Sequence, residues 1–159
     1  MVQISDLGRV LDEQPFMQGL DRELRDLLVG CAANERFDAG QYVFREGGAA
    51  DKFFLVRSGR IAIEVHAPGR PAIMVDTVGP GELTGWSWLM EPRRWTFDAR
   101  ATQLTRAVSF DAACLTRKME ARPALGYQVL KRFIPVMAHR IHSARMQMLD
   151  LYGPPGGGS

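Results

Sequence analysis

The chain has 159 residues, of which 46% are hydrophobic and 24% are charged, and its formal net charge is +2. A chain of this length forms one globular domain and buries roughly 70% of its unfolded surface, so it folds without a metal. No apolar run approaches the roughly 20 residues of a membrane-spanning helix, and no signal peptide follows Met1, so we expect a cytoplasmic protein that has no membrane anchor.

The first element predicted is a helix in the segment DRELRDLLVGCA, residues 21–32. Asp21 suits the N-cap position, and the apolar residues at 24, 27, 28 and 31 follow the i, i+3, i+4, i+7 spacing of one helix face. Cys31 ends this apolar stripe, and the second cysteine, Cys114, is far away in the sequence. Since neither belongs to a CxxC pair, we expect both to be reduced residues of the core.

From residue 35 the hydrophobic period changes to two. Short strand-like runs, such as KFFLVRSGRIAIEV (52–65) and PAIMVDTV (71–78), are separated by glycine turns. Strands joined by such short turns pair with antiparallel neighbours, because a parallel connection needs a long crossover. We therefore predict an antiparallel, jelly-roll-like β-roll over about residues 33–111, whose last two strands are WTFDARA and LTRAVSF.

A helical period returns after Asp111, which predicts C-terminal helices over about residues 112–152, with Pro123 in a first turn. One apolar series there has spacings of 4, 3, 4, 3, 4 and 3, the a/d seam of a coiled coil. A helix that only covers a monomer's core usually has a wider stripe. The seam predicts a homodimer through Leu130, Ile134, Met137, Ile141, Ala144, Met148 and Leu151.

The remaining segment, GPPGGGS at residues 153–159, has the composition of a linker, so we expect a disordered tail. One folded domain over residues 1–152 then accounts for the rest of the chain.

The order of these elements resembles the cyclic nucleotide-binding domain, and especially the sensor domain of Crp/Fnr transcription factors. The likeness covers about residues 12–152 and is carried by REGGAADKFFLVRSG, VGPGELTGW and RAVSFDAACL. It implies an α+β fold in which the roll is flanked by an N-terminal helix and a long C-terminal dimerisation helix. DNA-binding relatives continue into a helix-turn-helix domain that has no counterpart here, so we expect no direct DNA binding.

In this family a cassette binds the cyclic phosphate with backbone N–H groups at a glycine turn. Gly85 would supply the turn in GELTGWSWLMEPRRWTFDARA, residues 81–101. The usual ribose-binding Glu is replaced by Trp86, and the usual phosphate-binding Arg aligns with Trp95 or, with a shift, with Arg94 or Arg93. The candidate ligand-binding residues are Glu82, Leu83, Gly85, Trp86, Ser87, Trp88, Arg93, Arg94, Trp95, Thr96 and, on the long helix, Ser143.

These replacements predict a regulatory module that binds a cyclic nucleotide with low affinity, or another small ligand, and acts through contacts with another protein. A charge-assisted hydrogen bond contributes about 1.5–3 kcal/mol, so losing both anchors would weaken cAMP binding by roughly two to four orders of magnitude. Two alternatives remain. One is a cAMP or cGMP receptor that uses Arg94 or Arg93, and the other is a structural adaptor that binds no small molecule.

The sequence contains no paired carboxylates and no serine in a nucleophile motif, so we do not expect an enzyme. His139 and His142 are one turn apart on the long helix, but no further ligands accompany them. A solvated histidine pair is the simpler interpretation, and we expect neither a metal nor a resident cofactor.

Overall fold

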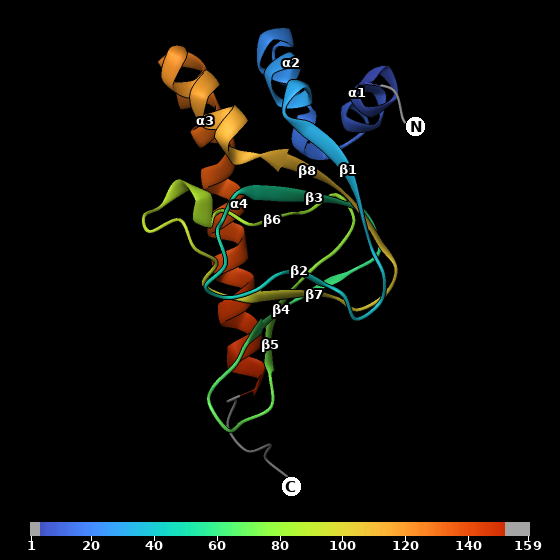
Figure 1. Cartoon of the computed structure of the whole chain (residues 1–159), viewed down its shortest axis with the longest axis vertical. Helices are drawn as coiled ribbons and strands as arrows, with labels where there is room; N and C mark the ends of the chain where they lie inside the picture. The colour runs from blue at the N-terminus through green and yellow to red at the C-terminus, as the bar shows by residue number, and fades with distance from the viewer. Residues whose placement is uncertain (1–3, 152–159) are drawn as a thin grey trace, which may run out of the picture.

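The structure, a computed structural model, describes residues 4–151, with side chains from 6 to 150. Figure 1 shows a β-roll with α1, α2 and α3 at one end and α4 along its side. This confirms the predicted α+β fold, an antiparallel roll between N-terminal and long C-terminal helices. The tail predicted for residues 153–159 lies outside the described residues.

Two four-stranded antiparallel sheets form the roll. The first has the order β1 (Ala32–Phe37), β8 (Thr105–Asp111), β3 (Lys52–Ser58) and β6 (Leu83–Thr84). The second has the order β2 (Tyr42–Phe44), β7 (Asp98–Ala101), β4 (Ile61–Val65) and β5 (Ile73–Val78). The cassette, residues 81–101, therefore begins beside the edge strand of the first sheet and ends in the middle of the second.

The core lies between the sheets and extends from the roll to the helices. Phe53 of β3 stacks on Phe110 of β8, with 4.5 Å between the ring centroids, and meets Phe133 of α4 edge-on at 4.7 Å. All three side chains are fully buried. Aromatic packing of this kind joins α4 to the roll, because each ring removes a large apolar area from water.

The N-terminal part contains α1 (Ile4–Asp12), a short 3-10 helix η1 (Pro15–Met17) and α2 (Arg22–Gly30). Asp21 caps α2 as predicted, because its side chain accepts a hydrogen bond from the backbone N–H of Leu24. Helix α1 was not predicted. Arg25 of α2 holds α1 through an ion pair with Asp12 (2.6 Å), and this bond lowers the pKa of the Asp12 carboxyl.

The prediction of two reduced cysteines is wrong in this structure. Cys31, the C-cap of α2, forms a disulfide with Cys114 in the first turn of α3 (Ala112–Ala121), and the two Cα atoms are 5.8 Å apart. The pairing follows from the sheet, since Ala32 at the start of β1 lies opposite Phe110 near the end of β8. The residues just outside these strands are thereby brought to disulfide distance.

Helix α4 (Pro123–Leu151) is the longest element, and it begins at the expected proline. Its buried face packs on the roll, whereas several predicted seam residues are exposed. Leu130 is 39% exposed, Ile134 62%, Ile141 48% and Met148 46%. An apolar stripe outside the core is what the predicted dimer requires. Within residues 4–151, no helix has the length and hydropathy to span a membrane.

Candidate functional site

A cavity of about 250 Å³, here called the cassette pocket, lies between the cassette and α4. Most of its lining is aromatic or aliphatic, and a few polar side chains interrupt it. The roll contributes Phe44, Ile63, Val75, Asp76, Thr84, Gly85, Trp86, Ser87, Trp95, Thr96 and Phe97, and α4 contributes Arg140, Ile141, Ala144, Arg145 and Met148. An apolar cavity with a few convergent polar groups is typical of small-molecule sites.

The glycine turn of the cassette is present where the sequence predicted it. Gly85 follows β6 with a φ of +89°, a conformation that L side chains rarely adopt. A Cβ atom at this position would lie 3.1 Å from the Trp95 ring. The turn therefore lies directly against the indole of Trp95. Both the positive φ and the lack of room for a Cβ atom require glycine at position 85.

Trp95 fills the space beneath this turn. Its side chain is buried and stacks on Phe44, with 3.9 Å between the ring centroids. Its backbone is bonded on both sides, since its N–H donates to Gly48 O (2.9 Å) and its carbonyl accepts from Gly47 N (2.8 Å). Trp95 is thus an integral part of the pocket wall.

The other two tryptophans occupy different environments. Trp86 is half-buried and lines the cassette pocket. Trp88, in the short 3-10 helix η2 (Ser87–Leu89), is buried in the core, where it stacks on Phe53 at 5.6 Å and meets Phe133 of α4 edge-on at 5.9 Å. Its indole nitrogen has no hydrogen-bond partner among the described residues. Trp88 therefore joins the cassette directly to α4.

The pocket brings together Gly85, Trp86, Ser87, Trp95 and Thr96 from the predicted set, but not the predicted guanidinium groups. Arg94 is exposed and donates to Gly47 O (2.8 Å). Arg93 is exposed, with a φ of 58°, and pairs with Glu91 (3.2 Å). The remaining predicted residues, Glu82, Leu83, Trp88 and Ser143, also lie outside the lining.

Arg140 of α4 is the most important residue of the site that was not predicted from the sequence. It is buried, forms ion pairs with Asp76 of β5 (3.1 Å) and with Glu82, and donates to Thr77 O (2.7 Å). Removing one partner of a buried pair leaves an uncompensated charge and typically costs about 3–5 kcal/mol. This network therefore clamps the middle of α4 to β5 and to the start of the cassette.

A sequence signal for Arg140 did exist. It lies seven residues after Phe133, so the helical repeat places it on the buried face of α4. A charged residue on such a face requires buried partners.

Arg145, which also lines the pocket, forms no ion pair among the described residues. Nor do three His, Cys, Asp or Glu side chains in this part of the chain gather into a possible metal site.

Known proteins share this sequence pattern and fold. Residues 34–122 match the family model described as cyclic nucleotide-binding domain. The chain is 29% identical, over 145 residues, to a CRP-like cAMP-activated global transcriptional regulator of Mycobacterium tuberculosis; the match covers 91% of this chain and 63% of the relative. The chain thus spans less than two thirds of that relative's length.

Two solved structures have a similar fold. A cyclic nucleotide-binding domain from Methylobacillus flagellatus has a TM-score of 0.73 at 16% identity, covering 98% of this chain and 85% of the other. The N-terminal domain of a transcriptional regulator from Streptomyces coelicolor has a TM-score of 0.63 at 23% identity, covering 94% and 99%. At these identities the likeness establishes the fold.

Proposed function

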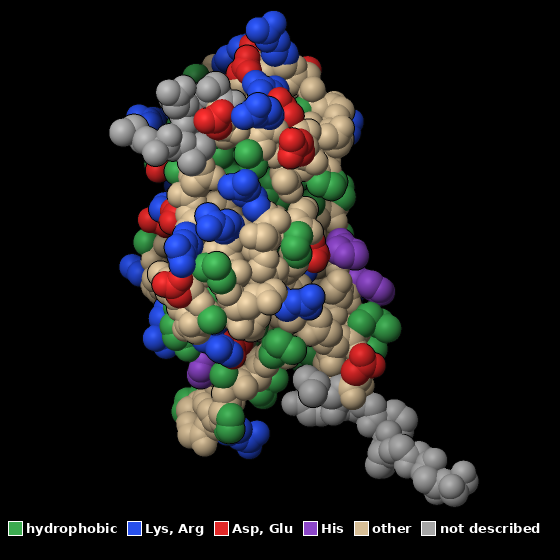
Figure 2. Space-filling view, turned by 90° about the vertical axis from the view of Figure 1, so that its right-hand side faces the viewer, with side chains coloured by type: hydrophobic (Ala, Val, Ile, Leu, Met, Phe, Trp, Pro, Cys, Tyr) green, Lys and Arg blue, Asp and Glu red, His purple; other side chains and the backbone are tan. Residues whose placement is uncertain are grey.

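The chain belongs to the cyclic nucleotide-binding domain family, and from this premise we propose that it is a small regulatory module whose roll senses a small molecule. Its output is a contact with another protein rather than with DNA. On the face seen in Figure 2, basic and acidic side chains are intermixed and do not gather into a basic stripe. Such a stripe is the usual electrostatic footprint of a nucleic-acid site.

One observation carries the proposal on the ligand, namely the Trp95 ring beneath the Gly85 turn. A cyclic phosphate at this turn needs room beside the backbone N–H groups and a guanidinium to pair with. The ring takes the room, and it offers a π-face instead of a charge. We therefore propose that the pocket prefers a ligand with an apolar or aromatic body and binds cAMP weakly.

A second candidate is a cAMP or cGMP receptor, as the similarity to the cAMP-activated regulator of M. tuberculosis suggests. In this case Arg94 would release Gly47 O and turn inward, or Arg93 would leave Glu91. A third candidate is an adaptor whose tryptophans simply fill the fold. We place the module in the cytoplasm without catalytic activity. The Cys31–Cys114 disulfide, uncommon in that compartment, is the feature that opposes this location.

Hydrogen exchange along residues 125–150 tests the proposal. In the unmodified protein Trp88 packs on α4, and Trp86 lines the same pocket as Ile141, so α4 needs no ligand to be held. We expect its protection to be unchanged by cAMP. The Trp86→Glu variant should lose protection and regain it with cAMP, within the roughly 1–3 kcal/mol of typical allosteric coupling. Trp86→Phe, which keeps an aromatic ring, should behave as the unmodified chain.

Two outcomes would contradict this mechanism. One is strong cAMP-dependent protection of α4 in the unmodified protein, which would identify a true cyclic nucleotide receptor. The other is unchanged protection in Trp86→Glu, which would show that the indole does not hold the helix.

We also propose that the module is a parallel homodimer through the α4 seam. Exposed Ile134 and Ile141 form a stripe that monomers rarely leave in water. Ile134→Asp with Ile141→Asp should therefore give a folded monomer by light scattering and circular dichroism. Leu104→Asp, at an exposed apolar residue before β8, is the matched control and should remain dimeric. A monomeric unmodified chain would refute the dimer.

A further inference from the structure

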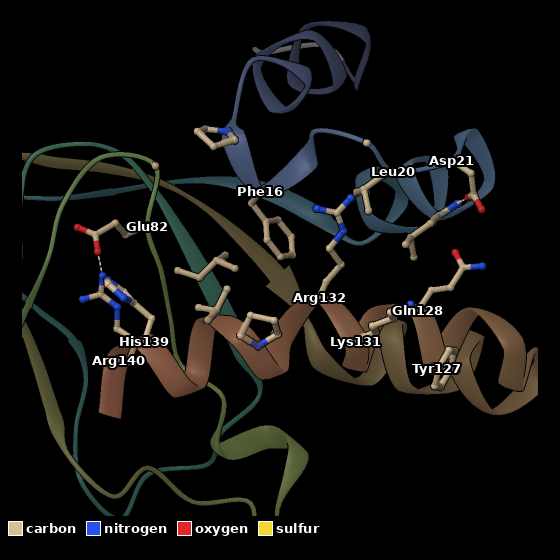
Figure 3. A pocket seen from close by; sticks show the side chains of 17 residues that line it. Phe16, Leu20, Asp21, Glu82, Tyr127, Gln128, Lys131, Arg132, His139 and Arg140 are labelled. Carbon is tan, nitrogen blue, oxygen red and sulfur yellow. Dashed lines mark hydrogen bonds and ion pairs between the residues drawn. The ribbon is translucent and has the colours of Figure 1, made fainter. Parts of the chain in front are cut away.

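A second and larger hollow, of about 1050 Å³, lies beside α4 and is here called the α4 groove. Its lining comes from three elements: α4 between Tyr127 and Arg140, the segment from Pro15 to Leu24, and the turn from Gly81 to Leu83. Figure 3 shows the side chains of α4 and of the N-terminal segment facing one another across it. None of the cassette tryptophans contributes to this lining.

Much of the α4 groove lies on the flank of α4 that faces away from the dimer seam. Each residue turns a helix by about 100°, which places Arg132 and His139 nearly opposite the seam residues Ile134 and Ile141. Tyr127 and Lys131, which also line the groove, lie nearer the seam. A dimer formed through the seam would therefore leave the Arg132 and His139 side of the groove open. The groove is accordingly a surface that the dimer does not explain.

The floor of the groove is apolar. It includes Phe16, Leu20, Leu83 and Val136. Phe16 is anchored there by an edge-on contact with Phe133, with 5.8 Å between the ring centroids. Residues 127–140 of α4 form one wall, and at a rise of about 1.5 Å per residue the groove is about 20 Å long. This is enough for three to four turns of a second helix, roughly the length of helix that such grooves bind.

The charged groups of the groove are mainly basic. Lys131 and Arg132 have no acidic partner among the described residues; Arg132 instead donates to Gln18 O (2.6 Å). Glu82 is ion-paired with Arg140, whereas the Asp21 carboxylate, which accepts from the N–H of Leu24, lies on the N-terminal side of the groove. The groove therefore has an apolar floor, and on the α4 side Lys131 and Arg132 form a cationic edge without an acidic partner among the described residues.

We propose that the α4 groove binds an amphipathic helix of a partner protein, one that carries acidic residues beside its apolar face. This inference rests on the proposed function, because it supplies the surface for the module's protein contact. The partner's apolar residues pack on Phe16, Leu20 and Val136, and its carboxylates lie beside Lys131 and Arg132. Arg140 lines both the groove and the cassette pocket, so its ion pairs connect the partner surface with the sensing site.

Fluorescence anisotropy with the full chain tests this surface. The probe is a labelled synthetic helix of about 14 residues, with leucines on one face and glutamates on the adjoining flank; the comparison peptide has lysines in place of the glutamates. We expect the acidic peptide to bind at least about tenfold more tightly at low salt, and the difference to shrink as salt screens the charges.

Charge reversal in the groove identifies the site. Lys131 and His139 make no hydrogen bond or ion pair among the described residues, so Lys131→Glu with His139→Glu should fold normally. It should lose binding of the acidic peptide and gain binding of the basic one. Arg70→Glu with Arg106→Glu, at exposed cations outside the groove lining, is the matched control and should leave both affinities unchanged. Leu20→Ser, in the floor, should weaken both peptides.

Three results would overturn the inference: equal binding of the two peptides, insensitivity to the Lys131 and His139 changes, or a change of oligomeric state in that variant. The last would mean that a second copy of the chain occupies the groove. The hydrogen-exchange test of the sensing function uses no peptide and alters no groove residue. Failure of the docking surface and failure of the sensing function are therefore separable.

Discussion

Replacing Trp86 by Glu and Trp95 by Arg in the same chain should strengthen cAMP binding by roughly two to four orders of magnitude. The two changes supply a carboxylate for the ribose hydroxyl and a guanidinium for the phosphate, each forming a charge-assisted hydrogen bond of about 1.5–3 kcal/mol. The Trp95 change also clears the space beneath the Gly85 turn. Isothermal titration calorimetry of the unmodified chain, the single variants and the double variant measures the gain.

The control for this gain is Trp95→Leu combined with Trp86→Glu, which opens the same space without adding the cation. It should recover only a small part of the affinity. Trp95 packs on Phe44, and removing a buried indole typically costs about 3–5 kcal/mol, so circular dichroism must first show that each variant is folded. A folded double variant with no better affinity than the unmodified chain would mean that the pocket does not hold the phosphate at Gly85.

Reducing the Cys31–Cys114 disulfide should lower the free energy of unfolding by about 4–5 kcal/mol. The two cysteines are 83 residues apart, so the bond removes a large loop entropy from the unfolded chain. It also ties α2 to α3, which an ion pair between Glu23 and Arg122 joins as well. Urea denaturation with and without a reductant measures the effect.

A chain with both Cys31→Ser and Cys114→Ser is the control, because its stability should not respond to the reductant. The account of the disulfide would fail if two free thiols react in the unreduced protein. It would also fail if the oxidised and reduced proteins unfold at the same urea concentration.

The parts of the fold that depend on local sequence were predictable. Asp21 caps α2 and Pro123 begins α4, because both effects depend on neighbours within one helical turn. The antiparallel roll followed from alternating strands and short turns. The features that could not be predicted depend on which strands and helices lie beside one another in the folded chain. The disulfide requires β1 to lie beside β8, and the Arg140 clamp requires α4 to cross β5 at Asp76.

In the candidate site, too, some features could be predicted from the sequence and others could not. The sequence predicted Gly85 and the pocket wall formed by Trp86 and Trp95, but left open whether Arg94 faces the pocket. Backbone pairing of residues 94–95 with residues 47–49 decides this in the structure. Adjacent side chains of an extended segment point to opposite sides, so with Trp95 inside, Arg94 lies outside.

The sequence also could not predict that the three tryptophans occupy different environments. Trp86 and Trp88 are only two residues apart, yet Trp86, the N-cap of the 3-10 helix, lines the pocket, whereas Trp88, inside that helix, lies in the core against Phe133. A short irregular segment has no period from which such directions follow.

We propose that tryptophans take the place of the two charged anchors in the cassette pocket. Calorimetric titration of the unmodified chain with cAMP tests it most directly. We expect a dissociation constant well above the low-micromolar range, because neither Trp86 nor Trp95 can replace a charge-assisted bond. Tight, stoichiometric binding of cAMP by the unmodified chain would contradict the claim.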